Sequence, residues 1–175
     1  MLFRSFSIIS PLGYPGVEII EKLAKKVENK DIYKFPRPMI KSKDLNFSFS
    51  GLKTSMFYLL KKTSDKNQIK NLNYLASSYQ EAVFETILLK IKKANDQYKV
   101  NNLVVVGGVT ANQRLRLLIR NYAKENKINV LFPSFKKYCT DNAAMIGVVA
   151  NYKFDKAIVQ KDFDKLDRVP RLKIK

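Results

Sequence analysis

The sequence predicts an α/β domain built around parallel strands. An apolar, β-branched run at residues 103–106 ends in two glycines and is followed by helical periodicity over residues 111–124. A second apolar run at 128–132 leads through a polar turn to an apolar helical segment at 140–149. A strand-helix-strand order needs a crossover connection, which brings the two strands together in parallel. The continuous apolar character of residues 103–106 further predicts a buried strand.

Shorter elements precede this core. Residues 18–28 place apolar side chains on one helical face and lysines on the other, which predicts an amphipathic helix. The prolines within 36–38 require an extended segment, because proline fixes φ and disfavours helix in the residue before it. Phenylalanine and serine alternate at 47–50 as in a short strand, and Ser50 is placed to cap a helix over 51–62.

The middle and the end of the chain complete the expected organisation. Residues 68–96 carry a long apolar stripe at helical spacing, which predicts one helix or two joined by a kink, with the stripe in the core. Residues 157–159 would add an edge strand. We therefore divide the chain into an atypical extension at 1–11, one lobe at 12–160 and a basic tail at 161–175.

The composition describes a basic chain that can bury a core. Of its 175 residues, 46% are hydrophobic, which suits a single domain. The 33 Lys and Arg against 15 Asp and Glu give a net charge of +18, a field that attracts polyanions such as RNA. The lysines are spread along the chain, so a compositional bias explains the same charge.

The sequence also suggests the compartment. Cys139 is the chain's one cysteine, so an internal disulfide is excluded and a reducing environment fits. No apolar run approaches the roughly 20 residues of a membrane span. The short apolar start lacks a convincing cleavage site for a secretory signal. We expect a cytoplasmic protein without a membrane partner.

The glycine turn after residues 103–106 is a candidate binding site. Gly107 and Gly108 allow the backbone to turn sharply where a phosphate or nucleoside can approach, and the next helix N-terminus favours an anion. A tight strand-to-helix connection uses the same residues without a ligand. Asn112 closes the turn, and its amide can serve a sugar hydroxyl or cap the helix.

Other enzyme signatures are missing from the sequence. The chain has no histidine and no Gly-x-Ser-x-Gly elbow, so a hydrolase triad has no base. The glycine turn lacks the third glycine of the dinucleotide fingerprint, and no Gly-Lys-Ser/Thr phosphate loop occurs.

Several blocks, taken in order, are typical of one family. They are Tyr-Pro-Gly at 14–16, Phe-Pro-Arg-Pro-Met at 35–39, Phe-Ser-Phe-Ser-Gly-Leu-Lys-Thr at 47–54, Gly-Gly-Val-Thr-Ala-Asn at 107–112 and Cys-Thr-Asp-Asn-Ala-Ala-Met-Ile at 139–146. Over roughly residues 12–150 the chain closely resembles the C-terminal half of the tRNA threonylcarbamoyladenosine synthase family (TsaD), formerly called glycoproteases or O-sialoglycoprotein endopeptidases.

The resemblance implies a fold, a reaction and partners. The fold is the C-terminal lobe of an actin-like, ribonuclease-H-like architecture. The reaction transfers threonylcarbamoyl from threonylcarbamoyl-adenylate to the N6 amine of an adenosine beside the tRNA anticodon. Both the adenylate and tRNA are therefore implied partners.

The family also implies a metal site at Asp141. The aspartate of the Cys-Thr-Asp-Asn block is a metal ligand there, for iron by the family pattern or for zinc or magnesium. A helix N-cap is the alternative role for Asp141. The family completes its site with two histidines of a His-x-x-x-His helix in the N-terminal half, and this chain has none. Because open metal sites keep about three protein ligands, we expect no catalytic residue and no catalysis from this chain alone.

The resemblance assigns substrate contacts as well. It implies that Asn112 contacts the adenylate or ribose, beside Gly107 and Gly108, and that Glu21 is the acid of the ribose site. A solvated helix face is the alternative place for Glu21. Val17 stands where the family has the second glycine of Tyr-Pro-Gly-Gly-Pro, which adds a Cβ where close approach or a positive φ is needed.

Three functional hypotheses remain open at this point. The first is a nucleotide-binding lobe of the transferase, inactive alone and completed by a separate N-terminal half. Residues 1–10 do not resemble the family segment before Tyr-Pro-Gly, which suggests a truncated, split or decayed gene. The second is a noncatalytic interaction protein that keeps the family's partner surfaces and pairs with a paralogous subunit. The third is a basic RNA-binding protein that retains the scaffold.

Overall fold

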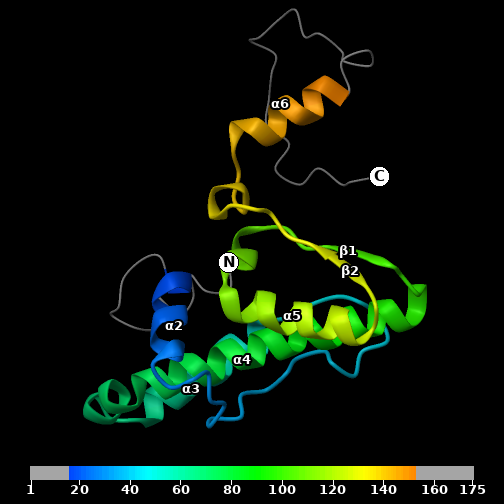
Figure 1. Ribbon diagram of the computed structural model, residues 1–175. Helices are drawn as coiled ribbons and strands as arrows, with labels where there is room; N and C mark the ends of the chain where they lie inside the picture. Colours follow the sequence, from blue (N-terminus) through cyan, green and yellow to red (C-terminus); the bar gives the residue numbers. More distant parts are fainter. Residues whose placement is uncertain (1–15, 153–175) are drawn as a thin grey trace, which may run out of the picture. The chain divides into compact units, whose positions relative to one another are not determined.

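The computed structural model describes residues 16–152 and follows a helix-rich α/β order (Figure 1). The N-terminal helices are α2 (Gly16–Lys25), α3 (Ser50–Lys62) and α4 (Asp65–Tyr98). The α/β part follows, with β1 (Asn102–Val104), the 3₁₀ turn η1 (Gly108–Ala111), α5 (Gln113–Glu125), β2 (Asn129–Leu131), the 3₁₀ turn η2 (Lys136–Tyr138) and α6 (Ala143–Tyr152).

The chain divides into two compact units, with the boundary between Cys139 and Thr140. The first unit holds the elements from α2 to η2, and the second holds α6. The predicted strand at 157–159, the extension at 1–11 and the tail at 161–175 lie outside the described residues. Within residues 16–152, no helix is both long and apolar enough to cross a membrane.

The predicted helices of the first unit are present. The helix predicted at 18–28 is α2, which ends earlier because the following turn places Glu28 and Asn29 at φ of 54° and 57°. The apolar stripe at 68–96 forms one helix, α4, rather than two. The helix predicted at 111–124 is α5, preceded by the 3₁₀ turn η1. Apolar periodicity was the signal in each case.

Two local predictions before and at α3 were wrong. Residues 47–49 form no strand, and the rings of Phe47 and Phe49 stack on each other at 5.9 Å. Ser50 is the first residue of α3 rather than its cap, and Phe49 holds the cap position without a side-chain hydrogen bond. The inward face of α3 still packs as expected, because Leu52 and Met56 are fully buried.

Side chains of α4 hold the first part of the segment between α2 and α3. Ser77 Oγ donates to Lys30 O at 2.8 Å, and Ser78 Oγ accepts from the backbone N–H groups of Ile32 and Tyr33. These three bonds satisfy backbone groups that have no strand partner. Later in the segment, buried Lys90 donates to Ser42 Oγ and to Asp44 O, each at 2.8 Å.

The sheet confirms the predicted parallel pairing. β1 and β2 run parallel, with Leu103 opposite Val130. The expectation of a strand buried on both faces was wrong, since Val104 and Val106 are 64% and 69% exposed. In the first unit α4 and α5 lie on the same side of the two strands (Figure 1), so only the side chains that point toward them are covered.

Candidate functional site

The glycine turn after β1 has the sharp, positive-φ backbone for which the sequence provides glycine. Gly107 has φ of 100°, a conformation that L side chains rarely adopt, although a Cβ there would meet open space. The backbone N–H and Oγ1 of Thr110 both donate to Gly107 O, at 3.0 and 2.7 Å. Gly108 begins η1 and is exposed. The turn is therefore fixed, and both of its glycines are exposed to solvent.

Asn112 caps α5 and is almost fully buried, at 1% exposure. Its Oδ1 accepts from the backbone N–H groups of Arg114 at 2.9 Å and Leu115 at 3.2 Å. Its Nδ2 donates to Gln80 Oε1 at 3.0 Å, and Gln80 Nε2 donates in turn to Asn29 Oδ1 at 3.0 Å. The capping alternative for Asn112 is thus present in the structure, with a link to α4 that the sequence did not reveal.

Glu21 reaches the same helix end from α2. Its Oε1 accepts from the backbone N–H of Gln113, 92 residues later, at 3.2 Å and pairs with Lys25 Nζ at 3.0 Å. Glu21 is buried, so its alternative placement on a solvated helix face was wrong. A carboxylate at a helix N-terminus is favoured by the helix dipole. Together Glu21 and Asn112 occupy the first-turn N–H groups of α5, where the sequence suggested an external anion.

Val17 lies in the first turn of α2 and therefore has a helical backbone. An α-helix has negative φ, which any L residue adopts. The positive φ that was expected to disfavour a side chain at this position is therefore not needed.

An ion pair joins α4 to α5 beside the cap. Arg114 donates through Nε to Glu81 Oε1 at 3.0 Å and through Nη2 to Oε2 at 2.8 Å. These hydrogen bonds raise the pKa of Arg114, while burial opposes the rise. The bidentate geometry fixes the direction of both side chains.

Arg116 is a buried residue that the sequence analysis did not single out. Its Nε donates to Thr110 O at 2.5 Å, and its Nη2 donates to Pro133 O at 3.0 Å and contacts Cys139 Sγ at 3.6 Å. The guanidinium also lies over the Phe132 ring, 5.0 Å from its centroid. Arg116 therefore ties the glycine turn to the segment after β2. Arg116 lies four residues after Asn112, and this spacing, which places two residues on one helix face, is the signal in the sequence that could have identified it.

Asp141 lies in the second unit and is exposed. The cap of α6 is its neighbour Asn142, whose Oδ1 accepts from Met145 N at 3.1 Å, so the capping alternative for Asp141 was wrong. Across residues 16–152, no cluster of three or more His, Cys, Asp and Glu is arranged to hold a metal ion. Asp141 supplies one carboxylate, and one ligand alone is too few for a catalytic metal ion, which keeps about three protein ligands.

Comparison with known proteins identifies the family of the chain. The TsaD family model, described as tRNA N6-adenosine threonylcarbamoyltransferase, matches residues 3–148. A relative of that name from Thermosipho africanus is 44% identical over 173 residues, which cover 98% of this chain and 50% of the relative. The chain belongs to the TsaD family.

Other relatives of the same name are similarly close to this chain. A tRNA N6-adenosine threonylcarbamoyltransferase of Kosmotoga olearia is 43% identical over 147 residues, 84% of this chain and 42% of the relative. The protein of the same name from Buchnera aphidicola subsp. Acyrthosiphon pisum is 44% identical over 142 residues, which cover 81% of this chain and 41% of the relative. This TsaD chain spans about half the length of the curated relatives that it matches.

The contact between Asn112 and Gln80 predicts an energetic coupling in this TsaD chain. Asn112→Ala removes the α5 cap, at about 1 kcal/mol, and leaves Gln80 Oε1 buried without its donor, at about 1 to 3 kcal/mol more. Urea unfolding of Asn112→Ala, Gln80→Ala and the double variant measures the coupling. We expect the double variant to lose at least 0.5 kcal/mol less than the sum of the two single losses, roughly the lower limit for contacting residues.

Exposed Gln113 provides the control for that cycle. Gln113→Ala, one residue along the helix, should change the free energy of unfolding by less than about 0.5 kcal/mol. Strict additivity of the Asn112 and Gln80 losses would mean that the two amides act independently.

Arg116 predicts a second stability effect. Arg116→Met keeps an unbranched side chain but leaves Thr110 O and Pro133 O without their buried donor, so it should lower the free energy of unfolding by about 2 kcal/mol or more. Arg120, one turn later, lies over the same Phe132 ring at 5.2 Å but is exposed. Arg120→Met should cost less than about 0.5 kcal/mol in the same urea titration. Equal losses for the two variants would show that the ring contact, not the carbonyl bonds, matters at Arg116.

Proposed function

We propose that this chain supplies the C-terminal, actin-like lobe of a tRNA N6-adenosine threonylcarbamoyltransferase. The observation that carries the proposal is the family match over residues 3–148, which includes both the glycine turn and the Asp141 block. The mixed α/β order with a parallel strand pair supports an actin-like lobe. The reaction would transfer threonylcarbamoyl from its adenylate to the N6 amine of a tRNA adenosine.

The adenylate would bind at the glycine turn. In open parallel sheets, ligands bind outside the carboxyl ends of the strands, and the turn directly follows that end of β1. Gly107 and exposed Gly108 would let the nucleotide approach the backbone. Asn112 and Glu21 would serve this site by holding the start of α5, because both side chains already bond its first turn.

The metal part of the site would be shared with residues from outside this chain. Asp141 would offer one carboxylate ligand to iron, zinc or magnesium, and the chain has no histidine to add. When bound, such an ion supplies Lewis-acid chemistry to a carbonyl or phosphate oxygen. The missing ligands would come from an N-terminal half, on the same polypeptide or a separate one, or from a paralogous subunit. The 175 residues alone would be inactive.

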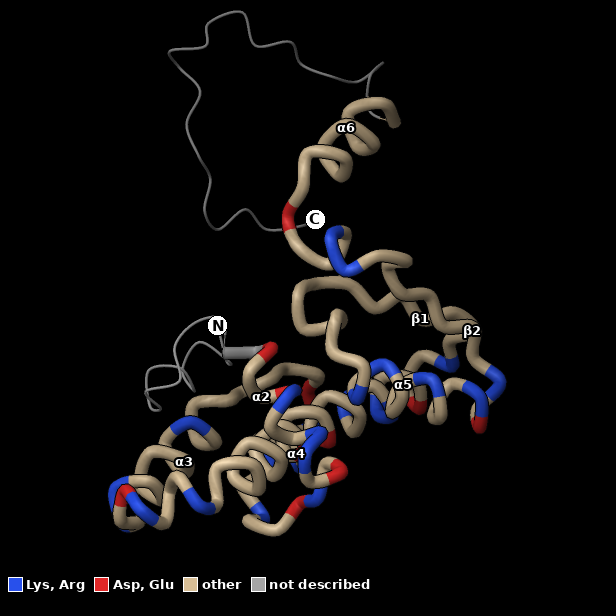
Figure 2. Tube along the Cα trace, turned by 60° about the vertical axis from the view of Figure 1, so that its left-hand side comes forward, with Lys and Arg blue, Asp and Glu red and all other residues tan. Residues whose placement is uncertain are grey.

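A noncatalytic RNA-binding or interaction protein is the second candidate. It is favoured by the net charge of +18, and Figure 2 shows Lys and Arg spread over α3, α4 and α5. Reconstitution separates the candidates. The chain is mixed with the half of the Thermosipho africanus relative that it does not match, and transfer to tRNA is measured. Transfer that needs both pieces supports the lobe, whereas tRNA binding without any transfer supports the second candidate.

Asp141 gives the sharper prediction within that assay. Asp141→Asn should abolish transfer and reduce bound metal in the reconstituted protein, because the ion loses an anionic ligand. Its melting temperature should stay unchanged, since Asn142 rather than Asp141 caps α6. Asn142→Ala is the matched control, which should cost about 1 kcal/mol of helix stability while retaining bound metal. Wild-type transfer and metal content in Asp141→Asn would remove Asp141 from the proposed site.

A further inference from the structure

The outward face of α3 combines lysines with aromatic rings. Lys53, Phe57 and Lys61 follow one another at four-residue spacing, which places them on one helix face with about 6 Å of axial rise between neighbours. Leu52 and Met56 lie one residue before Lys53 and Phe57, about 100° away around the helix, and are fully buried in the core. The aromatic rings on the outward face are therefore not needed to attach α3 to the protein.

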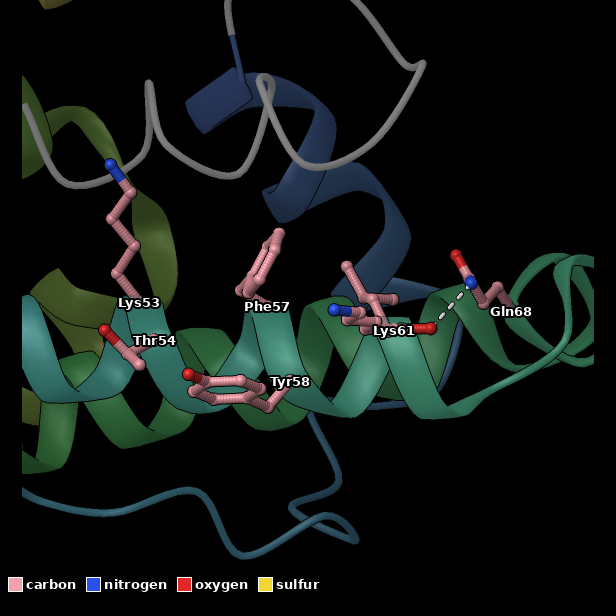
Figure 3. A pocket seen from close by; sticks show the side chains of 7 residues that line it. Lys53, Thr54, Phe57, Tyr58, Lys61 and Gln68 are labelled. Carbon is pink, nitrogen blue, oxygen red and sulfur yellow. Dashed lines mark hydrogen bonds between the residues drawn. The ribbon is translucent and has the colours of Figure 1, made fainter.

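This face lines a cavity of about 630 Å³. Figure 3 shows the lysines, Phe57 and Tyr58 projecting from α3, with Gln68 near the start of α4. Gln68 Nε2 donates to Leu60 O at 2.9 Å and to Thr63 O at 2.8 Å, which fixes that end of the cavity. The full lining is Lys53, Thr54, Phe57, Tyr58, Leu60, Lys61 and Gln68.

The two rings remain open to a ligand. Phe57 and Tyr58 are 50% and 56% exposed and meet edge to face, with centroids 5.7 Å apart. Exposed aromatic rings beside cations form the usual platform for unpaired bases, because every base has a flat π-face that can stack on a ring. The lysines one turn before and after Phe57 can pair with backbone phosphates.

The charge of the cavity selects among possible occupants. Its lining contains two lysines and no acidic residue. An apolar protein surface would have to bury both lysines without partners, which is costly. A nucleic-acid duplex would supply phosphates but no free base face for the rings. A polyanion with unstacked bases uses both features, since its phosphates pair with the lysines and its bases stack on the rings.

The geometry points to a single-stranded RNA subsite on α3, in which one base stacks on Phe57 or Tyr58 and the adjacent phosphates pair with Lys53 and Lys61. The choice of RNA as the nucleic acid rests on the proposed function. This subsite on α3 is distinct from the glycine turn and would hold an unpaired part of the RNA.

Fluorescence anisotropy with a labelled single-stranded RNA octamer and a hairpin duplex tests the site on the full chain. The Phe57→Ala/Tyr58→Ala double variant should weaken binding of the single strand by about tenfold, the typical effect of losing one base-aromatic stack. Tyr152→Ala, at an 85% exposed ring in the second unit, is the aromatic control and should bind as wild type.

Substitution of the lysines should change the salt dependence of RNA binding. The Lys53→Gln/Lys61→Gln double variant should reduce the slope of log affinity against log salt by about 1.4, since each phosphate contact on a single strand contributes roughly 0.7. Lys26 and Lys124 are exposed lysines on other segments, and their double change to Gln matches the charge. This control should lower the slope by less than half as much.

Ultraviolet crosslinking of the wild-type chain to the same octamer, with mass spectrometry, adds a readout that does not depend on any variant folding. We expect crosslinks in the α3 peptide that contains Phe57 and Tyr58. Crosslinks confined to other elements, or pocket variants that bind the octamer as tightly as their controls, would overturn the subsite. No transfer reaction is involved, so loss of transfer with intact octamer binding would count against the proposed function and not against the subsite.

Discussion

The N-terminus of α5 is the point on which the rest of the first unit depends. Its first-turn N–H groups are bonded by Glu21 from α2 and by Asn112, and Asn112 is bonded in turn to Gln80 of α4. Three elements that are distant in sequence therefore meet at one helix end. Since the glycine turn leads directly into this helix, the same contacts determine where Gly107 and Gly108 lie.

Polar side chains in the interior of α4 extend this arrangement. Buried Ser77, Ser78 and Gln80 bond the segment that follows α2, and Lys90 bonds it farther along. A buried polar group costs free energy unless it is paired, so each of these contacts specifies one position of the segment rather than adding general cohesion. Arg116 acts in the same way on the other side of α5, where it joins the glycine turn to the chain after β2.

Periodicity and motif order were enough to predict the helices, the parallel strands and the family. They failed at several positions, for different physical reasons. Glu21 looks like a surface residue of α2 because its bond to Gln113 spans 92 positions. The cap of α6 falls on Asn142 rather than Asp141, a one-residue difference between two good capping residues. Val104 is exposed because, among residues 16–139, nothing covers one face of the sheet, and the continuous apolar run of the strand does not reveal this.

The central claim is that this chain's own side chains preform the start of α5 and thus the glycine turn. Amide hydrogen exchange of the wild-type chain tests it most directly. The backbone N–H groups of Gln113, Arg114 and Leu115 should exchange as slowly as that of buried Ile119 in the middle of the helix, because opening them requires breaking the contacts with α2 and α4. Rapid exchange of these three groups while Ile119 stays protected would show a frayed helix start and would contradict the claim.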